Sequence, residues 1–229
     1  NNTTASNNVA VGYIALQSNT TGEKNTAVGV ESLQNNTTAS NNTAFGRRAG
    51  KANTTGTEIV AVGQGALESN TTANHNVAVG SNALNLNTTG QYNTALGSAA
   101  LIANTTADAN TSVGYGSLYT NTTGANNTAV GVNVLTSNTT ASGNAAIGFE
   151  ALQSNTTGAS NAAVGYQSLN AATTGSRNTG VGYQACDTHT TADDCVYIGH
   201  NAGSGQNTTN DNQLYIARTN TGAGNAATW

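Results

Sequence analysis

A repeat of 17 residues runs through the sequence and constrains the fold more than any other feature. Each repeat carries Val-Ala-Val-Gly or a close variant, then Ala-Leu, then Asn-Thr-Thr, as at residues 9–21. The glycine recurs without a change of spacing at positions 12, 29, 46, 63, 80, 97, 114, 131, 148, 165, 182 and 199. A chain with such a period is an array of short units, each of which buries its apolar face against its neighbours.

The residue types within the repeat predict strands and not helices. Apolar residues do not follow a 3.6-residue spacing, and β-branched residues alternate with Gly and Asn. We expect two short strands per repeat, around residues 9–11 and around Leu16. The corners would fall at Gly12 and at residues 19–25, where Gly and Asn tolerate unusual dihedrals. Stacked in register, these units predict an all-β fold, a parallel β-solenoid (β-roll); a transverse array of β-hairpins is the alternative.

The direction of each side chain follows from strand alternation. We expect the large residue before the glycine, Val11 in the first repeat, to point into the core together with Leu16. Ala10 and Ala15 would then face outward. In the third repeat Gly50 stands at the Leu position and Phe45 at the Val position, so the Phe ring is expected to fill the space that the leucine vacates.

A column of small residues on the outside predicts an interface between copies of the chain. Solvent-facing strand positions normally carry charged or long polar side chains, and a contiguous apolar stripe usually marks an interface. The expected interface column consists of Ala10, Ala27, Ala44, Ala61, Ala78, Ala95, Ala129, Ala146 and Ala163. We therefore expect a parallel homo-oligomer.

Composition excludes several classes of partner. Only 7% of the 229 residues are charged and the net charge is −4, so there is no basic stripe to neutralise the phosphates of a nucleic acid. No apolar run approaches 18 residues, which argues against membrane insertion. The fixed offsets of the apolar residues argue against disorder, although large apolar residues are few.

The chain shows no converging set of catalytic residues. Its histidines do not recur in register with a carboxylate and a nucleophile, so we expect no enzymatic activity and no cofactor. One irregular repeat gathers side chains that could hold a metal ion, although a polar cap is the favoured interpretation and no metal site is assigned. These residues are Asp187, His189, Asp193 and Asp194.

Two cysteines replace two motif residues within that same repeat. Cys186 takes a Leu position and Cys195 takes an Asn position. A disulfide between them would offset the loss of the motif side chains, and two buried thiols that behave as small apolar residues are the alternative.

Surface features leave several alternatives open. Phe149, Tyr166 and Tyr183 follow the glycine in consecutive repeats and predict an aromatic ladder, either a carbohydrate-contact strip or, as favoured, cross-coil packing. Regular Thr columns suit an ice-binding face, but adjacent Thr20 and Thr21 face opposite ways, so only one column per repeat can point outward. Eleven Asn-Thr-Thr sequons are either glycosylation sites or corner structure.

The array is expected to cover residues 1–205 as twelve coils. The pattern loosens after residue 170, and one extra residue enters before Asn207. Residues 206–229 would form a degenerate last coil and a junction to a missing C-terminal part, and the start in mid-repeat suggests a piece of a longer chain.

The consensus Asn-Thr-Ala-Val-Gly-x-x-Ala-Leu-x-x-Asn-Thr-Thr-Gly, as at residues 25–39 and 127–141, resembles the repeat regions of phage tail-fibre and tail-spike-like proteins. In those proteins the repeats precede an endosialidase-type intramolecular chaperone. The motif is more distantly similar to the left-handed β-roll heads of trimeric autotransporter adhesins. These resemblances imply a left-handed solenoid, a parallel homotrimer and a location outside the cell or on a virion surface.

Taken together, the sequence predicts a structural fibre segment that holds a receptor-binding or anchoring tip and contacts host surface glycans at most secondarily. An ice-binding solenoid that uses Thr columns is the alternative from another class. A stalk or head of a bacterial surface adhesin is the third, and the repeat does not separate it from a phage fibre.

Overall fold

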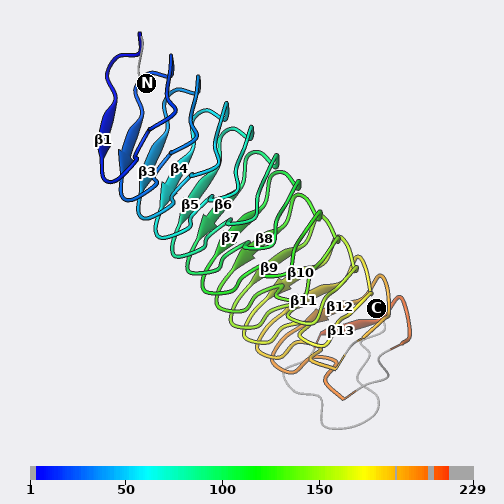
Figure 1. The fold of residues 1–229 in the computed structure, drawn as a ribbon. Coiled ribbons are helices and arrows are strands. Elements are labelled where there is room, and N and C mark those ends of the chain that lie inside the picture. Colours follow the sequence, from blue (N-terminus) through cyan, green and yellow to red (C-terminus); the bar gives the residue numbers. More distant parts are fainter. Residues whose placement is uncertain (1–3, 189, 206–208, 217–229) are drawn as a thin grey trace. The chain divides into compact units, whose positions relative to one another are not determined.

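The computed structural model describes residues 4–188, 190–205 and 209–216. They form a parallel β-solenoid of about twelve turns, and no helix occurs among these residues. Each turn, here called a coil, begins with one three-residue strand and ends at the position before the next strand (Figure 1). The strands are β1 (Val9–Val11), β2 (Thr26–Val28), β3 (Thr43–Phe45), β4 (Val60–Val62), β5 (Val77–Val79), β6 (Thr94–Leu96), β7 (Thr111–Val113), β8 (Thr128–Val130), β9 (Ala145–Ile147), β10 (Ala162–Val164), β11 (Thr179–Val181), β12 (Val196–Ile198) and β13 (Leu214–Ile216).

The chain divides into two compact units, residues 1–112 and 113–229. In the first unit each strand from β1 to β5 pairs in parallel with the next one, and each residue faces its equivalent 17 positions later. The second unit repeats this arrangement from β8 to β12. At its end β13 pairs with β12 at a shift of 18, Val196 facing Leu214, because of the extra residue before Asn207.

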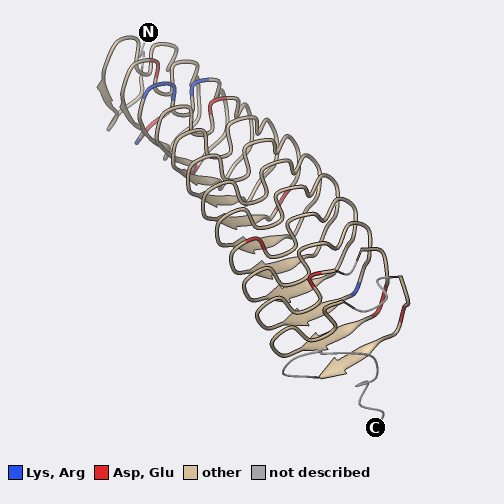
Figure 2. Cartoon of the chain, turned by 90° about the horizontal axis from the view of Figure 1, so that it is seen from below, with Lys and Arg blue, Asp and Glu red and all other residues tan. Residues whose placement is uncertain are grey.

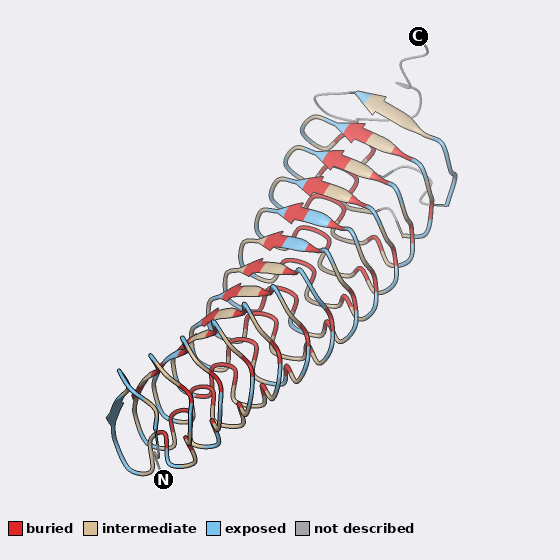
Figure 3. Cartoon of the chain, turned by 90° about the horizontal axis from the view of Figure 1, so that it is seen from above, coloured by how far each residue is buried: buried red, intermediate tan, exposed pale blue. Residues whose placement is uncertain are grey.

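The middle residue of each strand points into the coil, contrary to the sequence-based expectation. Ala27, Ala61 and Ala95 are fully buried, whereas the residues on either side of them are half-buried or exposed. Figure 3 shows this pattern as a buried centre in successive strands. The expected directions of Val11 and Ala10 are therefore reversed. A 17-residue coil is narrow, and its interior already holds a leucine and two asparagines, so only a small side chain fits at the strand.

The segment around the leucine is a turn and not a second strand. Leu67 has φ +50°, and Gly65 two residues earlier has φ +65°. This left-handed backbone, which is uncommon for residues other than Gly, lets two adjacent side chains point the same way. Ala66 and Leu67 are accordingly both fully buried. The inward leucine is thus confirmed, and the outward direction expected for the Ala15 column is wrong.

Two ladders of buried asparagines fill the rest of the interior. In the first, Asn53 Nδ2 donates to Asn36 Oδ1 at 2.9 Å and to Gly56 O at 2.9 Å. In the second, Asn93 N donates to Asn76 Oδ1 at 2.8 Å, and Asn93 Nδ2 donates to the carbonyl of residue 107 at 2.9 Å. The amide therefore satisfies buried backbone groups that a narrow coil leaves without partners. This role, and not tolerance of unusual dihedrals, explains asparagine here.

Candidate functional site

The outer face of the sheet is the most unusual surface of the chain. It consists of two columns of side chains, one from the first and one from the third residue of each strand. The first column is Val, Thr, Ala or Leu, and the third is Val, Phe, Leu or Ile. Exposure in the third column reaches 57% at Val11 and 58% at Phe45. Large apolar side chains thus stand in solvent at the place where a globular protein would hide them.

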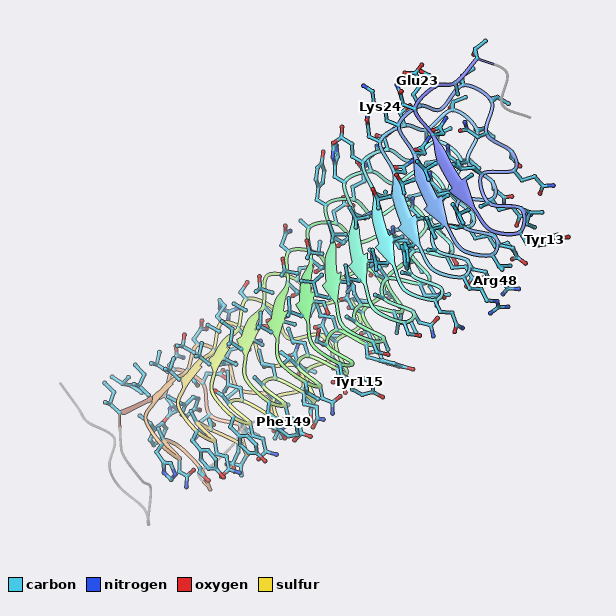
Figure 4. The ribbon with its side chains drawn as sticks, turned by 90° about the vertical axis from the view of Figure 1, so that its left-hand side faces the viewer. Tyr13, Glu23, Lys24, Arg48, Tyr115 and Phe149 are labelled. Atoms are coloured by element: carbon cyan, nitrogen blue, oxygen red, sulfur yellow. The ribbon has the colours of Figure 1, made fainter. Side chains whose placement is uncertain are left out.

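Charge is absent from this face. None of the residues in β1 to β13 is Lys, Arg, Asp or Glu. Figure 2 shows the charged residues on the connecting segments and none on the strands. In the first unit Tyr13 and Arg48 project from one side of their coils, and Glu23 and Lys24 project from another (Figure 4). An uncharged apolar sheet face of this kind normally marks an interface.

The alanine columns proposed as the interface lie inside the coils. Ala27, Ala44, Ala61, Ala78, Ala95, Ala129, Ala146 and Ala163 each have an exposure of 0%. Ala10 is exposed, and it belongs to β1, where all three residues are exposed. These residues pack against their own chain and cannot contact a second copy. Strand alternation correctly placed the alanines and the large apolar residues on opposite faces of each strand. The width of the coil interior, however, decides which of the two faces outward.

A glycine follows each of the strands β1 to β12 and turns the chain away from this face. Gly46 has φ +140°, and a Cβ at this position would lie 2.5 Å from the carbonyl oxygen of Gly63. Successive coils are therefore in direct backbone contact at this corner, and no other residue type fits. The strict recurrence of this glycine follows from that contact.

The aromatic ladder forms as expected, next to that corner. The rings of Phe149 and Tyr166 stack at 5.2 Å, those of Tyr166 and Tyr183 at 5.2 Å, and that of Tyr183 on His200 at 5.1 Å. Figure 4 shows Phe149 projecting from its coil. Because each inner ring has a neighbour on both faces, only ring edges meet the solvent. Sugars stack on ring faces, so this geometry favours cross-coil packing. The His200 rung was not identified from the sequence.

The threonine pair presents one exposed column. In residues 20–21 and their equivalents, the first threonine is half-buried and the second is exposed. Thr37 Oγ1 donates to the carbonyl oxygen of Thr54 at 3.0 Å, so the hydroxyl of the first column is engaged within the chain. The pair therefore does not build the flat two-column face that an ice-binding role for these threonines requires.

In the described part of the chain, the sequon asparagines from Asn19 to Asn155 are closed to modification in the folded state. Asn36, Asn70 and Asn104 are fully buried, and their amide nitrogens donate within the ladder and to backbone carbonyls. A sugar on this nitrogen would remove those hydrogen bonds and would not fit inside the coil. The Asn-Thr-Thr pattern is therefore explained by structure.

Cys186 and Cys195 are both buried, and both are free thiols. The structure therefore favours two buried thiols that behave as small apolar residues over a disulfide.

Burial raises the pKa of the nearby Tyr197 hydroxyl, and hydrogen bonding with the two thiols adds to that increase. Tyr197 is only 2% exposed. It stands where earlier strands carry Ala, Ser or Gly, and its ring occupies the space beside Gly203.

Charged side chains outside the sheet form ion pairs. Glu31 accepts from Lys51 Nζ at 2.6 Å and from Arg48 Nε at 3.1 Å, and Arg48 also reaches Glu68 at 3.3 Å. The hydrogen bond from Lys51 lowers the pKa of Glu31. Pairs this exposed contribute little to stability.

Two acidic residues of the irregular repeat, Asp193 and Asp194, are likewise paired, whereas Asp187 Oδ1 is buried without a hydrogen-bond partner. Arg177 Nε donates to Asp194 Oδ1 at 2.6 Å, and its Nη2 lies 3.2 Å from Asp193 Oδ2. The bond from Arg177 holds the pKa of Asp194 below its usual value. His189 lies outside the described residues. Among those that are described, no group of three or more His, Cys, Asp or Glu is placed to hold a metal ion.

The histidines in the described part do not form a catalytic constellation. His75 Nδ1 lies 3.0 Å from Glu58 Oε2 and its ring stacks on Tyr92, whereas His200 ends the aromatic ladder. No helix in the described ranges has the length and apolar character that crossing a membrane would require.

Three comparisons with known proteins gave no match. No protein-family model matches the chain, and no curated protein and no solved structure matches it either.

Proposed function

We propose that this chain is a non-enzymatic structural fibre segment whose copies pack in parallel through the outer face of the sheet. One observation carries the proposal: every strand presents uncharged, largely apolar side chains to solvent. An isolated chain would leave this stripe in water at a cost of about 25 cal/mol per Å². A fibre at a virion or cell surface gives the stripe a partner of identical chemistry, namely another copy.

The available area suits such an assembly. Each strand adds about 4.8 Å along the stack, and two outward columns span about 10 Å. The flat area of the outer face over thirteen strands is therefore on the order of 600 Å². The uneven surface of the side chains adds to this area, which brings it near the roughly 800 Å² per partner that a standard interface buries. Three copies around one axis is the number that the tail-fibre and adhesin resemblances support.

The interior supports a mechanical role. Within each unit, successive regular coils are joined by backbone hydrogen bonds at the strand, the turn and the Thr-Thr segment, and the asparagine ladders add side-chain bonds between coils. Such a stack resists bending because no coil can move without breaking several bonds at once. A rigid shaft that displays a tip, on a phage or on a bacterial surface, uses this property directly.

Light scattering on Val164→Lys tests the proposal. Val164 is 42% exposed on the outer face, so a lysine there should leave the fold intact and place like charges opposite each other in the assembly. The unmodified chain should have about three times its sequence mass of 22.8 kDa, and the variant should dissociate at least tenfold more readily. Thr157→Lys, exposed on the Thr column, is the matched control. An unmodified chain of 22.8 kDa with intact β-sheet circular dichroism would refute the proposal.

A further inference from the structure

The third-residue column of the outer face contains a second period. In strands β1 to β12, valine is replaced by a larger apolar residue at every third coil, and the two intervening coils carry valine. The last strand, β13, follows the extra residue and carries Ile216 beside Ile198. The larger residues are Phe45, Leu96, Ile147 and Ile198, spaced by 51 residues or three repeats of 17. Their exposures are 58%, 37%, 44% and 41%.

Packing within the chain does not require this size. Inside the coils, a change in the volume of one residue is matched by a change in its neighbour, as where Ile59 lies beside Gly50. On the outer face each larger side chain extends into solvent, and valine fills the same position in the other coils. A larger exposed apolar side chain only adds to the unfavourable contact with water in a single chain.

We propose that these four residues set the axial register between copies of the chain. The inference rests on the proposed function, because it takes the partner of this face to be a second copy in the same direction. A column made only of valines would look the same after each coil, that is, after a shift of about 4.8 Å along the stack. Two such columns can slip by one coil and lose only one layer of contact, so a uniform face specifies register weakly.

A larger residue at every third layer removes this degeneracy. After a slip of one or two coils, each Phe, Leu or Ile meets valine on the partner, which leaves a gap in one layer and crowding in another. The layers match again only after a slip of three coils, which sacrifices three layers of contact. The spacing therefore makes slips of one or two coils unfavourable relative to the aligned arrangement.

Cross-linking between neighbouring levels tests the inference. Thr128 and Ala145 are exposed first-column residues of β8 and β9, one coil apart. Chains with Thr128→Cys and chains with Ala145→Cys are mixed, refolded together and treated with a short bis-maleimide. Cys186 and Cys195 are buried and are not labelled in the folded chain. Peptide mass spectrometry then measures 128–145 links between different chains against 128–128 and 145–145 links.

The native column should give same-level links almost alone. In the background Phe45→Val, Leu96→Val, Ile147→Val and Ile198→Val, the ratio of different-level to same-level links should rise about tenfold, as expected when mismatched layers no longer carry a packing penalty. Leu86→Val with Ile102→Val truncates apolar residues outside the sheet and should leave the ratio unchanged.

The outcomes separate the two proposals. An assembly of unchanged mass in which the all-valine column gives the native ratio would overturn the register role and leave the fibre proposal intact. A mass of one chain by light scattering before cross-linking would refute the fibre proposal itself, and the register role with it.

Discussion

The coils that begin with β3 and β11 depart from the repeat at the same two positions and restore the interior in different ways. In the β3 coil Gly50 replaces leucine and Ile59 replaces asparagine. A Cβ on Gly50 would lie 3.6 Å from Ile59 Cδ1, so the isoleucine occupies the space of the missing leucine. Phe45, expected to do so, is 58% exposed. In the β11 coil both positions are cysteine, and the following coil adds Tyr197.

The comparison shows that the interior requires a total volume and not a particular residue. The Leu position and the Asn position before the next strand are neighbours inside the coil, nine residues apart in sequence. A loss at one can be filled from the other, or from the strand of the next coil. Because interiors are packed as densely as organic crystals, an uncompensated change should be costly.

Removing a leucine from a regular coil should have the largest effect. Leu152 is fully buried, and Leu152→Gly should cost about 3–5 kcal/mol in the free energy of unfolding through the cavity that it leaves. The second substitution Asn161→Ile reproduces the Gly–Ile pair of the β3 coil. It should restore at least about 1 kcal/mol of the free energy of unfolding, although the hydrogen bonds of the asparagine are lost. Urea unfolding of the single and double variants measures both values. A double variant less stable than the single one would show that the two positions do not share space.

Truncation of Tyr197 should have the next largest effect. The ring stacks on Tyr215 at 5.4 Å and stands beside Gly203, so Tyr197→Ala should cost about 3 kcal/mol. Hydrogen exchange should show the loss in the coils of β11 to β13 and spare those of β8 and β9, because coils contact only their neighbours. Tyr166→Ala, on the surface ladder, is the control and should cost less than about 1 kcal/mol.

Extending the first asparagine ladder should stabilise the chain moderately. Asn155 Oδ1 is buried without a hydrogen-bond partner, because Ala172 stands where the next asparagine would donate. Ala172→Asn should add about 1 kcal/mol to the free energy of unfolding. Ala172→Leu, of similar volume and without a donor, should not. Equal melting temperatures for Ala172→Asn and the unmodified chain would contradict this prediction.

Acid should produce the smallest effect. The pKa values of Glu31 and Asp194 are lowered by Lys51 and Arg177, respectively. Groups with depressed folded-state pKa values stabilise the fold above their unfolded values, 4.5 for Glu and 3.8 for Asp, and this contribution is lost as pH falls further. The melting midpoint should fall by a few degrees at most below pH 4.5. In Glu31→Gln the part of this decrease that arises from the ion pairs of Glu31 with Arg48 and Lys51 should be absent.

The sequence alone determined the architecture. The unbroken 17-residue period, the glycine after the first expected strand of each repeat and the inward leucine predicted a parallel solenoid. The first of the two strands expected per repeat is confirmed, whereas the second is a turn. The aromatic ladder also followed from the period, because equivalent residues in successive coils must stack. These features depend on local preferences and on spacing, both of which a sequence contains.

Only the tertiary structure decided which side of each strand is the inside. Alternation places Val11 and Ala10 on opposite faces, but the choice between them depends on how much space Leu16, Asn19 and Asn25 leave in the coil. That space is set by left-handed turn residues such as Glu31 at φ +60° and Leu33 at φ +45°. Neither Glu nor Leu is a residue type that predicts a left-handed backbone. With the leucine and the asparagines inside, only a small residue such as alanine fits at the strand of a regular coil, and the valines stand outside.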